Sequence, residues 1–161
     1  MNHISHCRIA VCVQLLLLGV VSVFTSCHST IIQSQDVPYS EWQQDSVLTF
    51  SADIQDTINA YDILFLLRTN NRYPYQNLWL FVAEYQDSML VVNDTIECTL
   101  ADERGRWLGR GTSHFELPLL YETQRHFRHS GNYTFVLTQG MREESLLGVE
   151  NITLKLVKSE Q

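Results

Sequence analysis

Apolar and polar residues alternate with a period of two along most of the chain after residue 46, which is the pattern of half-buried β-strands. In the first such segment Leu48, Phe50 and Ala52 share one face, and Thr49 and Ser51 share the other. The same period predicts three further inward rows, which are Ile96, Cys98 and Leu100; Tyr133, Phe135 and Leu137; and Ile152, Leu154 and Leu156. Residues 61–67 and 78–85 are apolar at almost every position and therefore predict central strands that are covered on both faces.

The succession of short strand patterns without a sustained helical stripe predicts an all-β fold. We expect a single antiparallel β-sandwich, Ig-like or jelly-roll-like, over residues 46–161. One helical turn is expected over residues 141–147. Residues 101–130 are expected to form a long irregular excursion, for which Gly105, Gly109 and Gly111 supply a permissive backbone.

The amino-terminal segment has the pattern of an export signal. Residues 9–26 carry no charge and follow Arg8, so residues 1–26 are predicted to be a signal peptide. The ending Phe24-Thr25-Ser26-Cys27 resembles a bacterial lipobox, which implies that Cys27 carries fatty-acyl chains such as palmitate and anchors the protein to a membrane. Residues 27–45 then form a lipidated tether, with Tyr39 and Trp42 packed on the edge of the domain. The alternative is a plain secretory signal cut near Ser26.

Cysteine usage and charge narrow the class of protein further. Cys7 and Cys12 lie in the predicted signal and Cys27 is the lipidation site, so Cys98 has no partner for a disulfide. We expect Cys98 to be buried and unreactive. Eleven Lys and Arg residues against 18 Asp and Glu residues give a net charge of -7, which disfavours binding to nucleic acid.

Three strings of the chain resemble one family of bacterial lipoproteins. They are LRTNNRYPYQNLWLFV at residues 67–82, LADERGRWLGRG at residues 100–111 and SGNYTFVLTQGMREESLLGVENITLKL at residues 130–156. Their Asn-Asn-x-Tyr-Pro-Tyr, Gly-Arg-Trp-Leu-Gly and Gln-Gly-Met-Arg elements look like those of the gliding motility lipoprotein GldH family of Bacteroidota. The resemblance implies an exported lipoprotein that gliding members need for movement over surfaces, linked to the machinery that moves surface adhesins. It carries over no catalytic residue.

Two sequence patterns typical of lipoproteins of this phylum bear on the location of the protein and on its modification. Surface lipoproteins of the phylum usually carry an acidic run directly after the lipidated cysteine, whereas this chain has no carboxylate between Cys27 and Asp36. We therefore expect an outer-membrane protein that faces the periplasm. Four Asp-Ser or Asp-Thr pairs resemble the O-glycosylation pattern of that phylum, although Asp before Ser or Thr is equally typical of turns that start strands. The hydroxyl groups concerned belong to Ser46, Thr57, Ser88 and Thr95.

Two groups of aromatic and basic residues are the candidate contact sites. In residues 105–111 we expect Trp107 to plug one end of the sandwich while Arg104, Arg106 and Arg110 stay at the surface, and Arg with Trp is also the composition of interface hot spots. A second group, formed by Tyr73, Tyr75 and Trp79, suits either core packing or stacking on sugar rings.

No pattern of residues indicates catalysis or a metal or organic cofactor. His126 and His129 are interleaved with Arg125 and Arg128, which would repel a divalent cation, and the glycines of residues 105–111 lack the ending of a phosphate-binding loop. No pair of carboxylates or nucleophile with a histidine partner can be identified. We therefore predict a non-catalytic scaffold or accessory component of the cell envelope that binds protein partners. The alternative is a module that binds glycan or peptidoglycan.

Overall fold

The computed structural model describes residues 30–159. The predicted signal peptide and Cys27 lie outside these described residues. Within them, no helix is long and apolar enough to cross a membrane. The one helical element among residues 30–159 is the short 3-10 helix η1, Pro38–Ser40, and most of the other described residues are in strands.

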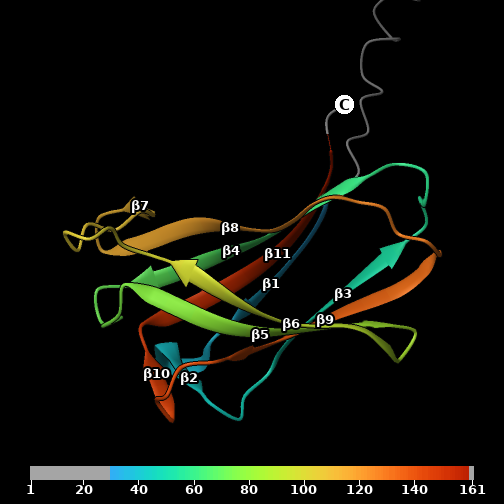
Figure 1. Cartoon of the computed structure of the whole chain (residues 1–161). Coiled ribbons are helices and arrows are strands. Elements are labelled where there is room, and N and C mark those ends of the chain that lie inside the picture. Colours follow the sequence, from blue (N-terminus) through green and yellow to red (C-terminus); the bar gives the residue numbers. More distant parts are fainter. Residues whose placement is uncertain (1–29, 160–161) are drawn as a thin grey trace, which may run out of the picture.

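Eight long strands form two facing sheets, as Figure 1 shows. One sheet has the order β1-β11-β4-β8-β7 and the other has the order β3-β9-β5-β6. Only the β5–β6 connection joins neighbours within one sheet, because every other connection between long strands crosses to the opposite sheet. All pairings are antiparallel, and this order is that of a jelly roll. The bounds are β1 Ile31–Asp36, β2 Glu41–Gln43, β3 Leu48–Ile54, β4 Tyr61–Asn70, β5 Asn77–Gln86, β6 Met89–Thr99, β7 Arg110–Gly111, β8 His114–Arg125, β9 Gly131–Gln139, β10 Ser145–Leu147 and β11 Val149–Lys158.

The core lies between the two sheets and is built from the predicted inward rows. Phe65 of β4 has its ring centroid 6.3 Å from that of Phe50 in β3 and 6.5 Å from that of Phe135 in β9. All three rings are fully buried, and burial of one such side chain contributes about 1.5–3 kcal/mol. Cys98 is also buried, as predicted, and burial raises the pKa of its thiol to about 12. The residues of the predicted inward rows are therefore buried as expected, except Ile96, which is half-buried and packs against the core.

The domain begins earlier than expected. Residues 31–36, which we expected to belong to a tether, form β1, and this strand pairs with β11 from Ile31↔Leu156 to Asp36↔Asn151. Trp42 is buried as predicted, but Tyr39 is 90% exposed and does not pack on the domain. In β1 two Ile residues are followed by four polar residues, so the sequence has no period-two alternation that would reveal the strand.

Two other local predictions were wrong. Residues 114–125 are not irregular but form β8, the longest strand, whose register against β4 shifts near Ile63 and which contains Gln124 at a positive φ of 52°. These irregularities interrupt the period-two pattern only from Glu122 onward, and residues 114–121 alternate regularly between exposed and half-buried positions. Residues 141–147 contain no helical turn, and their last three residues form β10, which pairs with β2.

The outer faces of the two central strands are less covered than the apolar runs predicted. In β4 the outward residues are half-buried. In β5, Trp79 and Phe81 face outward and are 37% and 46% exposed. Large aromatic groups on an uncovered sheet face are available for contact with a ligand or a partner.

The sandwich has two open sides, where the edge strands of the two sheets face each other, and among the described residues only one of these sides is bridged by hydrogen bonds. Beside β1 and β3, the side chains of Gln33 and Gln35 bond to the backbone of β3: Gln35 Nε2 donates to the carbonyl oxygen of Thr49, and the Ser51 amide donates to Gln33 Oε1. These bonds close the gap between the two edge strands. The opposite side, between β6 and β8, holds a cavity of about 450 Å³.

One ion pair lies between the sheets. The carboxylate of Glu84 in β5 is fully buried and lies 3.1 Å from Nη2 of Arg125, which also contacts the more exposed Glu122 at 2.9 Å. No described residue hydrogen-bonds Glu84 Oε2. Burial raises the pKa of Glu84, and the charge of Arg125 opposes that rise.

The sandwich has two ends with different loops. At the β1 end, the start of β1 lies beside the end of β11, the start of β4 and the end of β8. The loops at this end are residues 55–60, 87–88 and 126–130. At the distal end, the main loops are residues 71–76, 100–109 and 140–144.

Candidate ligand-binding groove at the distal end

The loop that carries the predicted Arg and Trp residues is ordered by short-range bonds. The carboxylate of Asp102 accepts hydrogen bonds from the backbone amides of Arg104 and Arg106 and lies 2.7 Å from the Arg106 guanidinium. These bonds lower the pKa of Asp102. Arg104, Arg106 and Arg110 are exposed. The prediction that the three arginines stay at the surface is confirmed.

Trp107 packs against the distal end of the core. Its ring stacks on Phe115 with centroids 5.1 Å apart and meets the edge of Tyr73 at 6.1 Å. Trp107 is half-buried and contacts the core cluster, as expected of a plug. An indole held on two sides contributes mainly to packing.

Tyr73 and Tyr75 come from one loop but have different surroundings. Tyr73 is buried, and its hydroxyl donates to the carbonyl oxygen of Asn77 at 2.7 Å. Tyr75 is half-buried, and its hydroxyl donates to Glu143 Oε1 at 2.6 Å. The hydrogen bond to the Glu143 carboxylate is the larger cause, and partial burial the smaller cause, of a raised pKa of Tyr75. Tyr73 is therefore a packing residue, which excludes it from direct ligand contact, whereas Tyr75 borders solvent.

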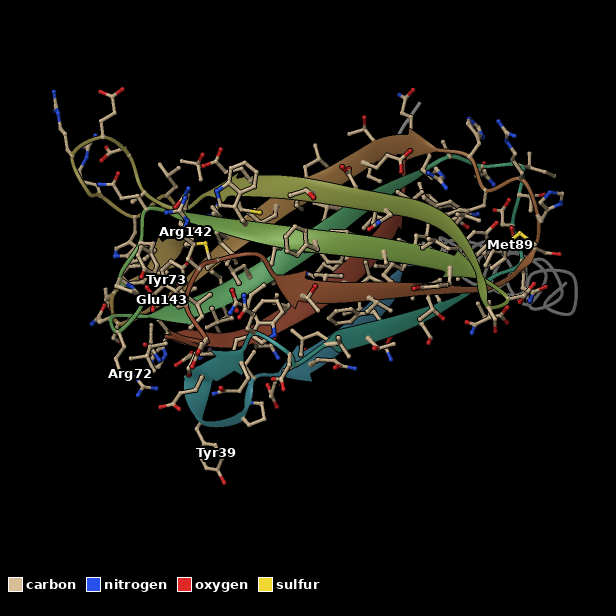
Figure 2. The ribbon with its side chains drawn as sticks, turned by 60° about the horizontal axis from the view of Figure 1, so that its bottom comes forward. Tyr39, Arg72, Tyr73, Met89, Arg142 and Glu143 are labelled. Atoms are coloured by element: carbon tan, nitrogen blue, oxygen red, sulfur yellow. The ribbon has the colours of Figure 1, made fainter. Side chains whose placement is uncertain are left out.

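A groove of about 410 Å³ opens beside Tyr75 at this end. The loop before β5, the first residues of β5 and the loop after β9 supply its walls, and the lining residues are Tyr75, Asn77, Trp79, Gly140, Met141, Arg142 and Glu143. Figure 2 shows Arg142 and Glu143 beside Tyr73 at this end of the sandwich. The groove therefore combines aromatic, amide, cationic and anionic groups within one depression.

Backbone contacts hold the loop after β9 against β5. The Gly140 amide donates to the carbonyl oxygen of Trp79 at 2.7 Å, and the Trp79 amide donates to Met141 Sδ at 3.4 Å. Gln139 is buried, and its side chain bonds to the Met141 amide and the Glu143 carbonyl oxygen, each at 2.8 Å. The buried side chain of Gln139 therefore holds the backbone of the loop that carries Arg142 in place.

Gly140 leaves room for the aromatic rings. A Cβ at this position would lie 3.2 Å from both the Trp79 Cβ and the ring of Phe81. A side chain at position 140 would therefore press against Trp79 and Phe81. Arg142 forms no ion pair with another residue of the described part, so its guanidinium is available to an anionic or polyhydroxylated ligand.

Sequence reasoning found part of this groove. It singled out Tyr75 and Trp79 but missed the wall formed by residues 140–143, because a helical turn was expected over residues 141–147. The signal for Phe81 was present, because the alternation in residues 78–82 places Trp79 and Phe81 opposite Leu78, Leu80 and Val82. Nothing in the sequence brings residues 140–143 to Tyr75, since the two loops meet only through the fold.

The remaining sequence candidates lie apart from the groove. His126 and His129 are in the loop after β8 at the β1 end. A third histidine, His114 in β8, contacts Glu150 at 2.8 Å. Among residues 30–159, no three His, Cys, Asp or Glu residues are grouped so that they could hold a metal ion. Ser46, Thr57, Ser88 and Thr95 are all exposed.

The strand order and the groove define a β-sandwich of the jelly-roll class with an aromatic-lined depression at its distal end. The family described as GldH lipoprotein matches residues 30–156, and the chain belongs to this family. A protein named "Gliding motility lipoprotein GldH homolog" from Christiangramia forsetii is 29% identical over 148 residues, which cover 87% of this chain and 91% of the relative. "Gliding motility lipoprotein GldH" from Flavobacterium johnsoniae is 33% identical over 138 residues, covering 84% and 86%.

Among solved structures, the chain is similar to one of the infectious bursal disease virus Gx strain, with a TM-score of 0.41 and 15% sequence identity. The match covers 83% of this chain and 33% of the viral chain.

Proposed function

We propose that this protein is an outer-membrane lipoprotein, anchored through Cys27 and facing the periplasm, that acts as a non-catalytic scaffold or accessory component of the cell envelope. In a gliding host its process would be motility over surfaces. Membership of a lipoprotein family whose named relatives carry gliding motility in their names supports this process. The lipobox-like ending before Cys27 supports the anchor.

The observation that carries the scaffold role is the composition of the distal end. Trp79 and Phe81 are exposed beside Arg142, and Arg104 and Arg106 are exposed on the neighbouring loop. Trp, Tyr and Arg are the residues that dominate protein interfaces, because they bury large areas and still satisfy polar partners. Rigid support by strands and by the bonds of Gln139 reduces the entropy that binding would cost.

A second function is favoured by the same groove. Tyr75 and Trp79 offer ring faces or edges, and Asn77, Arg142 and Glu143 offer hydrogen-bonding groups around them. This combination suits a sugar chain, whose apolar ring face stacks on aromatic groups while its hydroxyls need donors and acceptors. A periplasmic domain with such a groove would bind peptidoglycan or another envelope glycan.

Crosslinking in living cells tests the two functions. A photo-crosslinking amino acid at position 79 lies in the groove, and the same amino acid at position 93 is the matched control. Asn93 is exposed on the neighbouring strand β6, pairs with Ala83 and therefore lies on the same sheet face but nearer the β1 end. Captured species are identified by mass spectrometry.

Each outcome separates the alternatives. Envelope proteins captured from position 79 and not from position 93 would support the scaffold. Peptidoglycan fragments captured alone would support the glycan module, and calorimetric titration with such fragments should then lose its heat in Trp79→Ala. Identical captures from both positions would show that the groove is not the contact site.

A further inference from the structure

The distance between the predicted lipid anchor and the folded domain is short. β1 begins at Ile31, four residues after Cys27, and four extended residues span at most about 14 Å. Ile31 lies beside Leu156 near the end of β11, so the loops of the β1 end are the nearest parts of the domain to the anchor. The strands run for about 30 Å along the sandwich, so the groove at the distal end is held far from the anchor.

The loops at the β1 end expose large apolar side chains. Ile58 is 86% exposed in the loop between β3 and β4, and Met89 is 71% exposed where the β5–β6 hairpin turns. Leu90 and Val91 follow Met89 and are also exposed. Figure 2 shows Met89 at one end of the sandwich and Tyr39, Tyr73 and Arg142 at the other. Apolar side chains on protruding loops are unfavourable in water and favourable at the interface of a bilayer.

A cationic pocket lies beside the hairpin. Its volume is about 570 Å³, and its lining is Gln86, Val91, Val92, Arg125, His126, Arg128, His129 and Tyr133. Arg125 is engaged by Glu84 and Glu122. Arg128 is exposed and forms no ion pair with any residue of the described range 30–159.

The carboxylates in the loops of the β1 end are already bonded. Asp56 lies 2.6 Å from Lys158 Nζ, and its pKa is lowered by that contact and by bonds from Asn59. Asp87 accepts a hydrogen bond from the Asn132 amide at 3.2 Å. Lys158 therefore offsets the charge of Asp56, and Arg128 is the cation in these loops with which an anionic headgroup can pair.

We propose that the β1 end rests on the bilayer, with Ile58 and Met89 entering the interface and the pocket at Arg128 receiving the phosphate of an anionic lipid headgroup. The inference rests on the proposed anchor at Cys27. In this orientation the long axis of the sandwich points away from the membrane. The distal groove then lies about 30 Å from the bilayer surface, where partners can reach it.

Depth measurements on the full-length lipoprotein in vesicles of phosphatidylglycerol and phosphatidylcholine test this orientation. An environment-sensitive label is placed at Met89→Cys, at Ile58→Cys and, as the control at the other end, at Tyr39→Cys. Cys98 is buried and acylation occupies the thiol of Cys27, so the new cysteine takes the label; in a sample without acyl chains, the parent protein labelled at Cys27 is subtracted as the blank. Brominated phospholipids should quench residues 58 and 89 at least about threefold more than residue 39. Arg128→Ala, combined with the label at residue 89, should lower the ratio of docked to undocked protein about fivefold.

Mass measurement of the same samples reports whether Cys27 is acylated. The anchor at Cys27 and the docking of the β1 end on the bilayer can therefore be refuted independently of each other. Equal quenching at residues 89 and 39 in an acylated protein would overturn the docking and leave the anchor intact. Preferential quenching at residue 89 in a protein without acyl chains would support the docking surface and refute the anchor. A protein that is neither acylated nor quenched at any position would refute both.

Discussion

Replacing Arg125 by Met should destabilise the domain strongly, because it leaves a buried carboxylate without its counter-charge. Glu84 is fully buried, and Arg125 lies 3.1 Å from its Oε1. Removing one partner of such a pair costs about 3–5 kcal/mol, since the remaining charge keeps its desolvation penalty. For a domain of this size that loss lowers the melting temperature by about 10–15 °C. Met is the suitable replacement, because it keeps the apolar stem and removes only the guanidinium.

The same reasoning predicts how the stability of the Arg125→Met variant depends on pH. Burial raises the pKa of Glu84 above 4.5, its ordinary value, and Arg125 opposes that rise. Without Arg125 the pKa rises further. A carboxyl group with a raised pKa binds more protons in the folded state than in the unfolded state, so stability falls as the pH rises through this interval. The deficit of Arg125→Met should therefore be largest at pH 8 and should shrink as the pH is lowered toward 4.5.

Urea unfolding followed by tryptophan fluorescence between pH 5 and pH 8 measures this deficit. Two variants serve as controls. Glu84→Gln combined with Arg125→Met removes both charges and should recover most of the loss, whereas Glu122→Gln removes only the more exposed partner and should cost less than about 1 kcal/mol. A deficit in Arg125→Met that is constant across this pH range, or below about 1 kcal/mol at pH 8, would refute the assignment of Glu84 as the buried charge.

Three further predictions concern a turn, a thiol and the surface hydroxyls. Gly148→Ala should cost at least about 3 kcal/mol in urea unfolding, because φ is 85° and the new Cβ would lie 2.3 Å from the Tyr73 amide nitrogen; Gly105→Ala, at a φ of 75° in open space, should cost only about 1 kcal/mol. Cys98 should react with iodoacetamide at pH 8 only in denaturant, and rapid reaction of the native protein would contradict its burial. If the Asp-Ser and Asp-Thr pairs are glycosylated, the intact mass from the native host should exceed that of the acylated polypeptide, and equality would exclude glycans on Ser46, Thr57, Ser88 and Thr95.

The sequence predicted the core well because the signal for it is local. In β3 and β9, each inward residue lies two positions from the next, and every one of these residues is buried in the structure. The fold class follows from several such rows without any knowledge of which strands pair. An all-β sandwich could therefore be inferred before its topology was known.

The order of the strands and two of the elements could not be predicted, because their causes are not local. β1 has four consecutive polar residues after its two Ile residues and becomes a strand by pairing with β11, more than 100 residues later in the chain. β8 keeps a period of two over residues 114–121 and loses it from Glu122, where its register shifts against β4 near Ile63. Residues 141–147 contain Arg and Glu residues typical of helices, yet pairing of β10 with β2 overrides that preference.

The candidate groove shows the same division between local and distant causes. Alternation along β5 is enough to place Trp79 and Phe81 on one outward face, and their exposure is the local part of the site. The other wall exists because β9 lies beside β5, which carries Met141 to within 3.4 Å of the Trp79 amide. The hydroxyl of Tyr75 then reaches Glu143, 68 residues away in the chain. A substitution in residues 140–143 should therefore change ligand or partner contact without unfolding the domain, whereas the buried Tyr73 beneath the same end should affect stability first.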